Sequence, residues 1–229
     1  MKQILIICFF VVSFAVGAVA EDGFFNRPIL NNISMPTGYT LKQNEFAIGL
    51  GSIGFGITDN IQVETNVLLY LFQIYNGNVK GNLFKSDSNA LAVGVDLMHL
   101  NLDIFDEETG ATVISPYIAY STIVSDKLFL HLSGQYSHFS AGIDTDDVET
   151  SFFTRGTSFN TGLEYCLSNR TKFLTEAGYD ATFNGMRFGG AVLFGWDAFR
   201  LKLGVQYYNP EGSGGYTMPV IGLWWRFNG

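Results

Sequence analysis

Apolar and polar residues alternate through most of the chain, and the last segment shows the pattern most clearly. From Pro219 onward every second residue is apolar, a set made up of Pro219, Ile221, Leu223, Trp225 and Phe227. The residues between them are smaller in the middle and end in the charged Arg226. A period of two predicts a β-strand with one apolar face. Trp225 and Phe227 place aromatic rings at one end of that face, and such rings favour the level of lipid headgroups.

The same alternation recurs in pairs of segments joined by short turns rich in Ser, Asp and Asn. Asp59-Asn60 separates Glu45–Thr58 from Ile61–Phe72, which predicts a β-hairpin. The further pairs are Asn78–Lys85 with Ala90–Asp103, Ala111–Val124 with Leu128–Ser140, Ser151–Leu167 with Thr171–Phe183, and Met186–Gly195 with Phe199–Tyr208. Longer polar connections are predicted at Asp103–Gly110, Ser140–Thr150 and Asn209–Gly215.

The composition favours a membrane barrel over a soluble all-β domain. Hydrophobic residues make up 47% of the 229 residues and charged residues only 15%, yet no long apolar run follows residue 20. A membrane-spanning helix needs about 18 or more such residues, whereas barrel strands alternate lipid-facing and lumen-facing side chains. A soluble sandwich also alternates. The polar face here holds small and amide residues rather than a dense cover of Lys and Glu, as expected for a lumen.

We therefore predict an all-β fold, a transmembrane antiparallel β-barrel of about twelve strands, with ten as the alternative. The short turns would lie on the periplasmic side and the longer connections outside. Bacterial single-chain barrels have even strand counts. If the first short turn and the C-terminus share one side, a strand must precede Glu45, and the weak segment Thr37–Lys42 is the candidate.

The first twenty residues have the pattern of an export signal. Lys2 precedes the apolar stretch Ile4–Val16, and Ala18-Val19-Ala20 is a small-x-small cleavage site. We expect a cleaved signal peptide at 1–20, an irregular lead-in at 21–36 and the barrel at 37–229. Cys166 would then be the one remaining cysteine, so neither a disulfide framework nor a thiolate metal site is expected. The net charge of −8 argues against a nucleic-acid partner.

Two segments resemble known outer-membrane proteins. The last strand is similar to the closing strand of bacterial outer-membrane β-barrels, which typically ends in an aromatic residue that the barrel-assembly machinery reads. Trp225 and Phe227 would carry that signal here, although Asn228 and Gly229 follow. The run Tyr39–Asn66 resembles a segment near the start of porin-like outer-membrane β-barrels of uncharacterised function. It shares a Tyr-Thr-Leu start, a Glu-Phe strand opening and a Gly-Ile-Thr-Asp-Asn hairpin. The resemblance implies an outer-membrane barrel and little about activity.

Charged and polar residues on the predicted inner faces are the best candidates for a site. The lumen-lining candidates are Glu64, Asp96, His131, Gln135, Glu164, Lys172, Glu176, Asp180, Lys202 and Arg226. Charges in a barrel interior pair with one another or line a water path. One interpretation is a plug of salt bridges in a narrow barrel. The other is a small pore whose acidic excess favours cations or neutral solutes.

Other groups of residues favour chemistry less strongly. His131 with Ser133, and His138 with Ser140, could serve a membrane-embedded hydrolase. Histidine and serine are ordinary lumen residues, however, and no partner carboxylate can be placed from the sequence. The segment Ser140–Thr150 carries four acidic residues whose oxygens suit Ca²⁺, but it lacks EF-hand spacing, so a solvated loop is preferred. We predict no metal site, no cofactor and no catalytic residue.

The function that fits these patterns best is that of a porin-like channel in the cell outer membrane for passive or facilitated passage of small molecules. A non-transporting structural or surface-interaction barrel is the alternative, and a membrane-embedded hydrolase is third. The expected partners are outer-membrane lipid, the barrel-assembly machinery and small solutes. The protein is not expected to be an enzyme.

Overall fold

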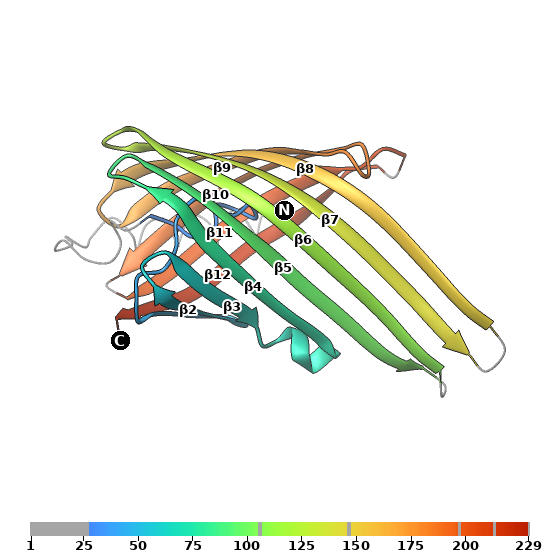
Figure 1. The fold of residues 1–229 in the computed structure, drawn as a ribbon. Coiled ribbons are helices and arrows are strands. Elements are labelled where there is room, and N and C mark those ends of the chain that lie inside the picture. The colour runs from blue at the N-terminus through green and yellow to red at the C-terminus, as the bar shows by residue number, and fades with distance from the viewer. Residues whose placement is uncertain (1–27, 105–106, 146–147, 197, 213, 229) are drawn as a thin grey trace, which may run out of the picture.

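The computed structural model describes residues 28–104, 107–145, 148–196, 198–212 and 214–228, and within these ranges the chain forms one closed sheet (Figure 1). The strands are β1 Glu45–Gly49, β2 Ser52–Thr58, β3 Ile61–Asn66, β4 Ile74–Lys85, β5 Asn89–Ile104, β6 Glu107–Ser125, β7 Leu128–Thr145, β8 Val148–Ser168, β9 Thr171–Asp180, β10 Gly185–Trp196, β11 Phe199–Asn209 and β12 Tyr216–Asn228. A short 3₁₀-helix, η3 Leu69–Phe72, follows β3. The predicted export signal at 1–20 lies outside the described residues.

The barrel closes where β1 pairs with β12, from Glu45 opposite Asn228 to Gly49 opposite Trp224. Every other strand pairs with its sequence neighbours in an antiparallel ladder. The prediction of an all-β, twelve-stranded antiparallel barrel is therefore confirmed. The chain needs no long crossover, because each hairpin brings the next strand directly beside the last.

The alternation of the sequence becomes the two faces of the wall. On β11, Val205 and Tyr207 are 57% and 41% exposed, whereas Lys202 and Gln206 between and before them are 8% and 6% exposed. Apolar side chains therefore face outward and polar side chains face the interior, the reverse of a soluble barrel. A barrel in lipid needs an apolar outer face, and alternation of side chains along each strand supplies it together with a polar interior.

The first strand is not where the sequence analysis placed it. Thr37–Lys42 is not a strand but lies in the barrel interior, where Thr37 and Leu41 are fully buried. The predicted single strand Glu45–Thr58 is instead two strands, β1 and β2, because Gly51 adopts a φ of 86° and reverses the chain. The count stays at twelve because one error offsets the other.

Two further boundaries differ. The predicted strand Ile61–Phe72 ends at Asn66, because the Asn76 side chain bonds to the Asn66 backbone and the chain then turns into η3. The expected outer loops Asp103–Gly110 and Ser140–Thr150 lie mostly within the long hairpins β5–β6 and β7–β8, whose pairing continues to Ile104 opposite Glu107 and Thr145 opposite Val148. The expected loop before β12 is present, between Asn209 and Tyr216.

The wall is uneven in height. Strands β5 to β8 are 16 to 21 residues long, whereas β1, β2 and β3 have 5, 7 and 6 residues. Figure 1 shows β7 and β8 running well past β2 and β3. A tilted strand needs roughly 9–11 residues to cross a bilayer, so β1 to β3 are too short to do so alone.

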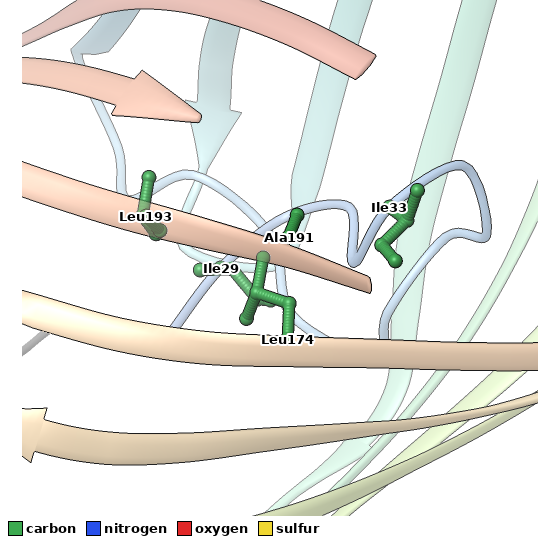
Figure 2. Close-up of a cluster of buried hydrophobic side chains, with 5 residues drawn as sticks. All are labelled: Ile29, Ile33, Leu174, Ala191 and Leu193. Carbon is green, nitrogen blue, oxygen red and sulfur yellow. The ribbon is translucent and has the colours of Figure 1, made fainter. Parts of the chain in front are cut away.

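Residues 28–44, which we call the inner segment, fill part of the interior. A turn is closed by a bridge between Asn31 and Pro36 and by bonds from Asn32 N to Met35 O at 2.9 Å and from Thr37 N to Leu30 O at 3.0 Å. The apolar side of the inner segment packs on the wall in a cluster made up of Ile29, Ile33, Leu174, Ala191 and Leu193 (Figure 2). The core of this protein is therefore the contact between the inner segment and β9 and β10.

Candidate functional site

The best-defined polar contact in the lumen is a carboxylate held by consecutive backbone amides. Glu176 Oε2 on β9 accepts hydrogen bonds from the backbone N–H groups of Ile33, Ser34 and Met35 at 3.0, 2.8 and 3.0 Å. Its Oε1 accepts a bond from Ser34 Oγ at 2.5 Å. Three amides converging on one buried carboxylate form an anion-binding concavity. Glu176 therefore fixes the turn of the inner segment against the wall.

Lysine and arginine side chains of the wall hold the carbonyl groups of the same segment. Lys202 Nζ donates to the carbonyl oxygens of Asn32 at 2.6 Å and Ile33 at 3.2 Å. Lys80 Nζ donates to the carbonyl oxygen of Leu30 at 3.1 Å, and Arg226 Nη1 donates to that of Pro28 at 3.1 Å. Buried polar backbone is stable only when paired, so these contacts satisfy a segment that has no ladder of its own.

The later half of the inner segment is anchored to the short part of the wall. Leu41 N donates to Gln62 Oε1 at 2.9 Å, and Asn82 Nδ2 donates to the carbonyl oxygen of Gly38 at 2.5 Å. Arg226 Nε donates to Glu45 Oε1 at 2.9 Å, and both side chains are buried. This ion pair spans the β1–β12 seam and therefore joins the two ends of the barrel.

A second group of buried polar side chains contacts the inner segment at Gly38. Ser121 Oγ is 2.7 Å from His131 Nδ1, and His131 Nε2 is 3.4 Å from Glu164 Oε2. Lys172 Nζ donates to Glu164 Oε1 at 2.6 Å. The Ser, His and Glu residues have no exposed surface, and Ser121 Oγ also accepts a bond from Gly38 N at 2.8 Å.

This group bears on the hydrolase hypothesis. His131 contacts Ser121 rather than Ser133, so the sequence analysis paired it with the wrong serine, because it considered neighbours along one strand and not across strands. The inner segment covers the Ser121 hydroxyl, which leaves no room for a substrate at that oxygen. Tyr39 packs edge-on against His131 with ring centroids 6.3 Å apart, and burial, with Glu164 nearby, raises the pKa of Tyr39 to about 12. The group acts as a buried anchor in this structure.

Cavities remain on both sides of the inner segment. One of about 540 Å³ is bordered by amide, carboxylate and ammonium groups, among them Gln62, Glu64, Lys80, Asp96, Gln135 and Lys202. Asn78 Nδ2 donates to Asp96 Oδ1 at 2.6 Å on its wall. A second, of about 290 Å³, lies toward β1 and β12. A third, of about 260 Å³, lies at the outer end beside Asp180 and Arg187.

The structure thus separates the ten lumen candidates into groups. Glu64, Asp96, Gln135 and Lys202 border the cavity of about 540 Å³. His131, Glu164 and Lys172 form the buried group, and Glu176 and Arg226 hold the inner segment. Asp180 stands apart at the outer end, where its Oδ1 accepts a bond from Thr182 N at 2.9 Å. Whether any of them contacts a solute stays a prediction.

Several interior residues are not among the ten lumen-lining candidates. Lys80 and Gln62 are almost fully buried and lie on inward positions of β4 and β3. The alternation of Asn78, Lys80 and Asn82 could have identified Lys80, because all three share one face. The ion pair of Glu45 with Arg226 could not be predicted from the sequence near Glu45, since Arg226 is 181 positions away.

Trp225 and Phe227 lie on the outer face, each 43% exposed. Trp225 packs on Phe199 with ring centroids 4.9 Å apart, and Trp196 stacks on Phe199 at 5.6 Å. These rings form part of an aromatic girdle at the C-terminal end of the wall, as expected at a membrane interface. Their recognition during assembly stays a prediction.

No helix in the described ranges is long and apolar enough to cross a membrane. Within the same ranges, no group of three or more His, Cys, Asp or Glu side chains is placed to hold a metal ion. Asp146 and Asp147 of the predicted acidic segment lie outside the described residues.

Comparisons with solved structures agree with this architecture. The fold is similar to that of the KdgM porin in complex with disordered oligogalacturonate, with a TM-score of 0.50, 13% sequence identity, and coverage of 80% of this chain and 97% of that chain. A second structure of the KdgM porin gives a TM-score of 0.48 at 14% identity over the same shares of each chain. The sequence matches no protein-family model and no curated protein. At this identity the likeness establishes the shared fold: the chain is a porin-like β-barrel.

Proposed function

We propose that this protein is a porin-like channel of the outer membrane that lets small polar molecules pass, and that its inner segment narrows the path. The predicted signal peptide would direct export, and the barrel-assembly machinery would insert the barrel. The observation that carries the proposal is the polar cavity of about 540 Å³ between the inner segment and β2 to β7. Amide and charged groups of both signs border it, and such a lining suits hydrated solutes rather than apolar ones.

The contacts of the inner segment support a narrow rather than a wide path. The segment is held by Glu176, Lys202 and Lys80 through bonds to its own backbone. Apart from the bond between the Ser34 hydroxyl and Glu176, these wall groups bond to backbone, so most side chains of the segment can vary while its position is kept. We infer a small conductance in the intact protein, limited by this segment.

Conductance in planar bilayers tests the proposal. The wild-type protein should give small, discrete steps, and Glu176→Ala should give larger ones, because three backbone N–H groups lose their acceptor and the turn of the inner segment is released. Phe188→Ala on the lipid face of β10 is the matched control and should leave the step size unchanged. Liposome swelling with sugars of increasing size then gives the size limit of the path.

A non-transporting barrel is the second candidate, and the buried anchors of the inner segment favour it. Glu176, Glu164 and Lys172 are each at most 3% exposed, so much of the lumen on the β8–β10 side is solid. If folded wild-type protein and Glu176→Ala both give no steps above background, the channel proposal is wrong and this candidate replaces it.

A further inference from the structure

A row of side chains crosses five neighbouring strands at the outer end of the lumen. In register order the row is Asn160 on β8, Gly178 on β9, Arg187 on β10, Tyr208 on β11 and Tyr216 on β12. Residues directly opposite each other share one face of a sheet. The Arg187 guanidinium donates to the side chain of Asn160, which is 7% exposed. The row therefore faces the interior of the barrel.

Two tyrosine rings of this row are turned toward the lumen. Tyr208 lies two positions after Gln206, whose side chain bonds to Ser34 Oγ of the inner segment, so both point inward. Tyr208 and Tyr216 pack edge-on, with ring centroids 5.6 Å apart and an angle of 84° between the rings. Tyr216 is nevertheless 47% exposed. Lipid covers exposed rings on the outer face of a barrel, but it does not reach the inner face, and exposed apolar surface in water commonly marks a binding site.

The cavity of about 260 Å³ lies against these rings. On β10, β11 and β12 it is bordered by inward-facing residues alone, which are Arg187, Gln206, Tyr208, Met218 and Tyr216. A further cavity of about 600 Å³ lies toward the rim and also borders Tyr208 and Tyr216. The same two rings therefore connect an inner pocket with a wider outer one, and a ligand that stacks on them can extend in both directions.

The charges around the two cavities do not favour an anion. Asp180 and Arg187 border the inner cavity, and Glu211 borders the outer one. Arg187 also lies 3.6 Å from the carboxylate of Glu176, as an ion pair. Ser158 lies opposite Asp180 on β8 and adds a hydroxyl group to the inner cavity. The lining thus combines aromatic faces with hydroxyl, amide and carboxylate groups, and its positive charge is already balanced.

The rim of the pocket is held in place by bonds between its two turns. Glu211 N in the β11–β12 loop donates to the carbonyl oxygen of Phe183 in the β9–β10 turn at 3.0 Å. The side chain of Asn184 donates to the carboxylate of Glu211. Asp180 Oδ1 accepts a bond from Thr182 N at 2.9 Å, which fixes the start of the β9–β10 turn. A pocket whose walls are already ordered binds a ligand at a lower entropic cost.

We propose that this outer pocket, made up of Ser158, Asp180, Arg187, Tyr208 and Tyr216, binds a neutral oligosaccharide. A sugar ring has a face of C–H groups, which stacks on an aromatic ring, and a rim of hydroxyl groups, which bond to polar side chains. One sugar unit lies against Tyr216, with its hydroxyl groups toward Asp180 and Ser158, and further units extend into the outer cavity. This inference goes beyond passage through the lumen and does not depend on it.

Saturation-transfer NMR on the full barrel tests the proposal, in micelles of dodecyldimethylamine oxide, a detergent without a sugar headgroup. The probes are four neutral trisaccharides: maltotriose, cellotriose, mannotriose and xylotriose. At least one of them should bind saturably, with a Kd of about 1 mM or lower. Absence of saturable binding for all four would overturn the proposal.

Substitutions at the ring locate the site. Tyr216→Ala removes the stacking surface and should weaken binding by about tenfold, whereas Tyr216→Phe keeps the ring and should stay within about threefold of wild type. Tyr207→Ala is the matched control, because Tyr207 is the neighbour of Tyr208 on the lipid face and is 41% exposed. It should leave binding unchanged. Wild-type affinity in folded Tyr216→Ala would contradict the proposed site.

A second variant serves if Tyr216→Ala does not fold. Asp180→Asn keeps an oxygen for the bond from Thr182 N and removes the negative charge. It should weaken binding of the neutral trisaccharide by about fivefold, because a charged acceptor of hydroxyl groups is stronger than a neutral one. Wild-type affinity in this variant would contradict the role of Asp180 in the pocket.

The chemical class has its own control, the acidic trisaccharide trigalacturonate. It should bind at least about tenfold more weakly than the best neutral probe, since Asp180 and Glu211 repel its carboxylates. Equal or tighter binding of trigalacturonate would overturn the neutral class. Conductance is not among these readouts, so a closed lumen would refute the proposed channel and leave this result unaffected.

Discussion

The two sides of the barrel are stabilised in different ways. The tall side, β5 to β8, is a continuous ladder in which β6 and β7 pair with both neighbours over most of their length. The short side, β1 to β3, has brief ladders and is supported from within by the inner segment: Leu41 N donates to Gln62, and Lys42 N donates to Glu45. The first side depends on local hairpin pairing, whereas the second depends on contacts between residues far apart in sequence. Substitutions of interior groups should therefore cost most on the short side.

The largest loss of stability is expected for Glu45→Ala. This change leaves Arg226 buried at the β1–β12 seam without its carboxylate, and breaking a buried pair costs about 3–5 kcal/mol. Denaturant unfolding in detergent micelles, followed by tryptophan fluorescence, measures the free energy of unfolding. Lys127→Ala, in the exposed turn between β6 and β7, should change it by about 0.5 kcal/mol or less. Equal costs for the two variants would contradict the difference between the sides.

The second-largest loss of stability is expected for Leu41→Ala. Leu41 is fully buried between the inner segment and β2, so its truncation should cost about 2–5 kcal/mol through a cavity that cannot be refilled. The matched change on the tall side is Leu132→Ala, where the side chain is 42% exposed on the lipid face of β7. Its cost in the same unfolding experiment should be clearly smaller, since lipid fills the space. A larger cost for Leu132→Ala would show that the inner segment does not support the short wall.

A glycine pair tests the closeness of the inner segment to the wall. A Cβ atom at Gly56 on β2 would overlap the carbonyl oxygen of Lys42, whereas a Cβ at Gly190 on β10 meets nothing within 4 Å. Gly56→Ala should cost about 1–3 kcal/mol by overpacking, and Gly190→Ala should be close to neutral. Melting of both purified variants in micelles gives the comparison. A neutral Gly56→Ala would mean that Lys42 moves freely away from β2.

The smallest effect on stability is expected for Phe227→Ala, because its ring lies half-exposed on the outer face. Its predicted role is in assembly, so the amount of folded barrel in the outer membrane should fall while the melting temperature of purified protein stays nearly unchanged. Phe183→Ala, an exposed ring in the β9–β10 turn, controls for the general loss of an aromatic residue. Normal assembly of Phe227→Ala would remove this residue from the proposed signal.

Some of the site followed from sequence and some did not. Lys202, Glu164 and Glu176, which the alternation assigned to inward faces, are at most 8% exposed in the structure. Their partners could not be predicted. Glu176 bonds to Ile33, which lies 143 positions earlier, and the sequence around residues 28–36 shows neither strand nor helix periodicity that would place it.

The sequence by itself determined the class of fold, the even number of strands and the side that most strand residues face. These are properties of a period of two and of short turns, and both act between near neighbours. Only the tertiary structure decided that residues 28–44 lie inside the barrel, that Glu45–Thr58 divides at Gly51, and that one side of the wall is shorter than the other. The reason is that these features depend on how a closed sheet fills its own interior, and a buried polar group can be satisfied by partners from any part of the chain.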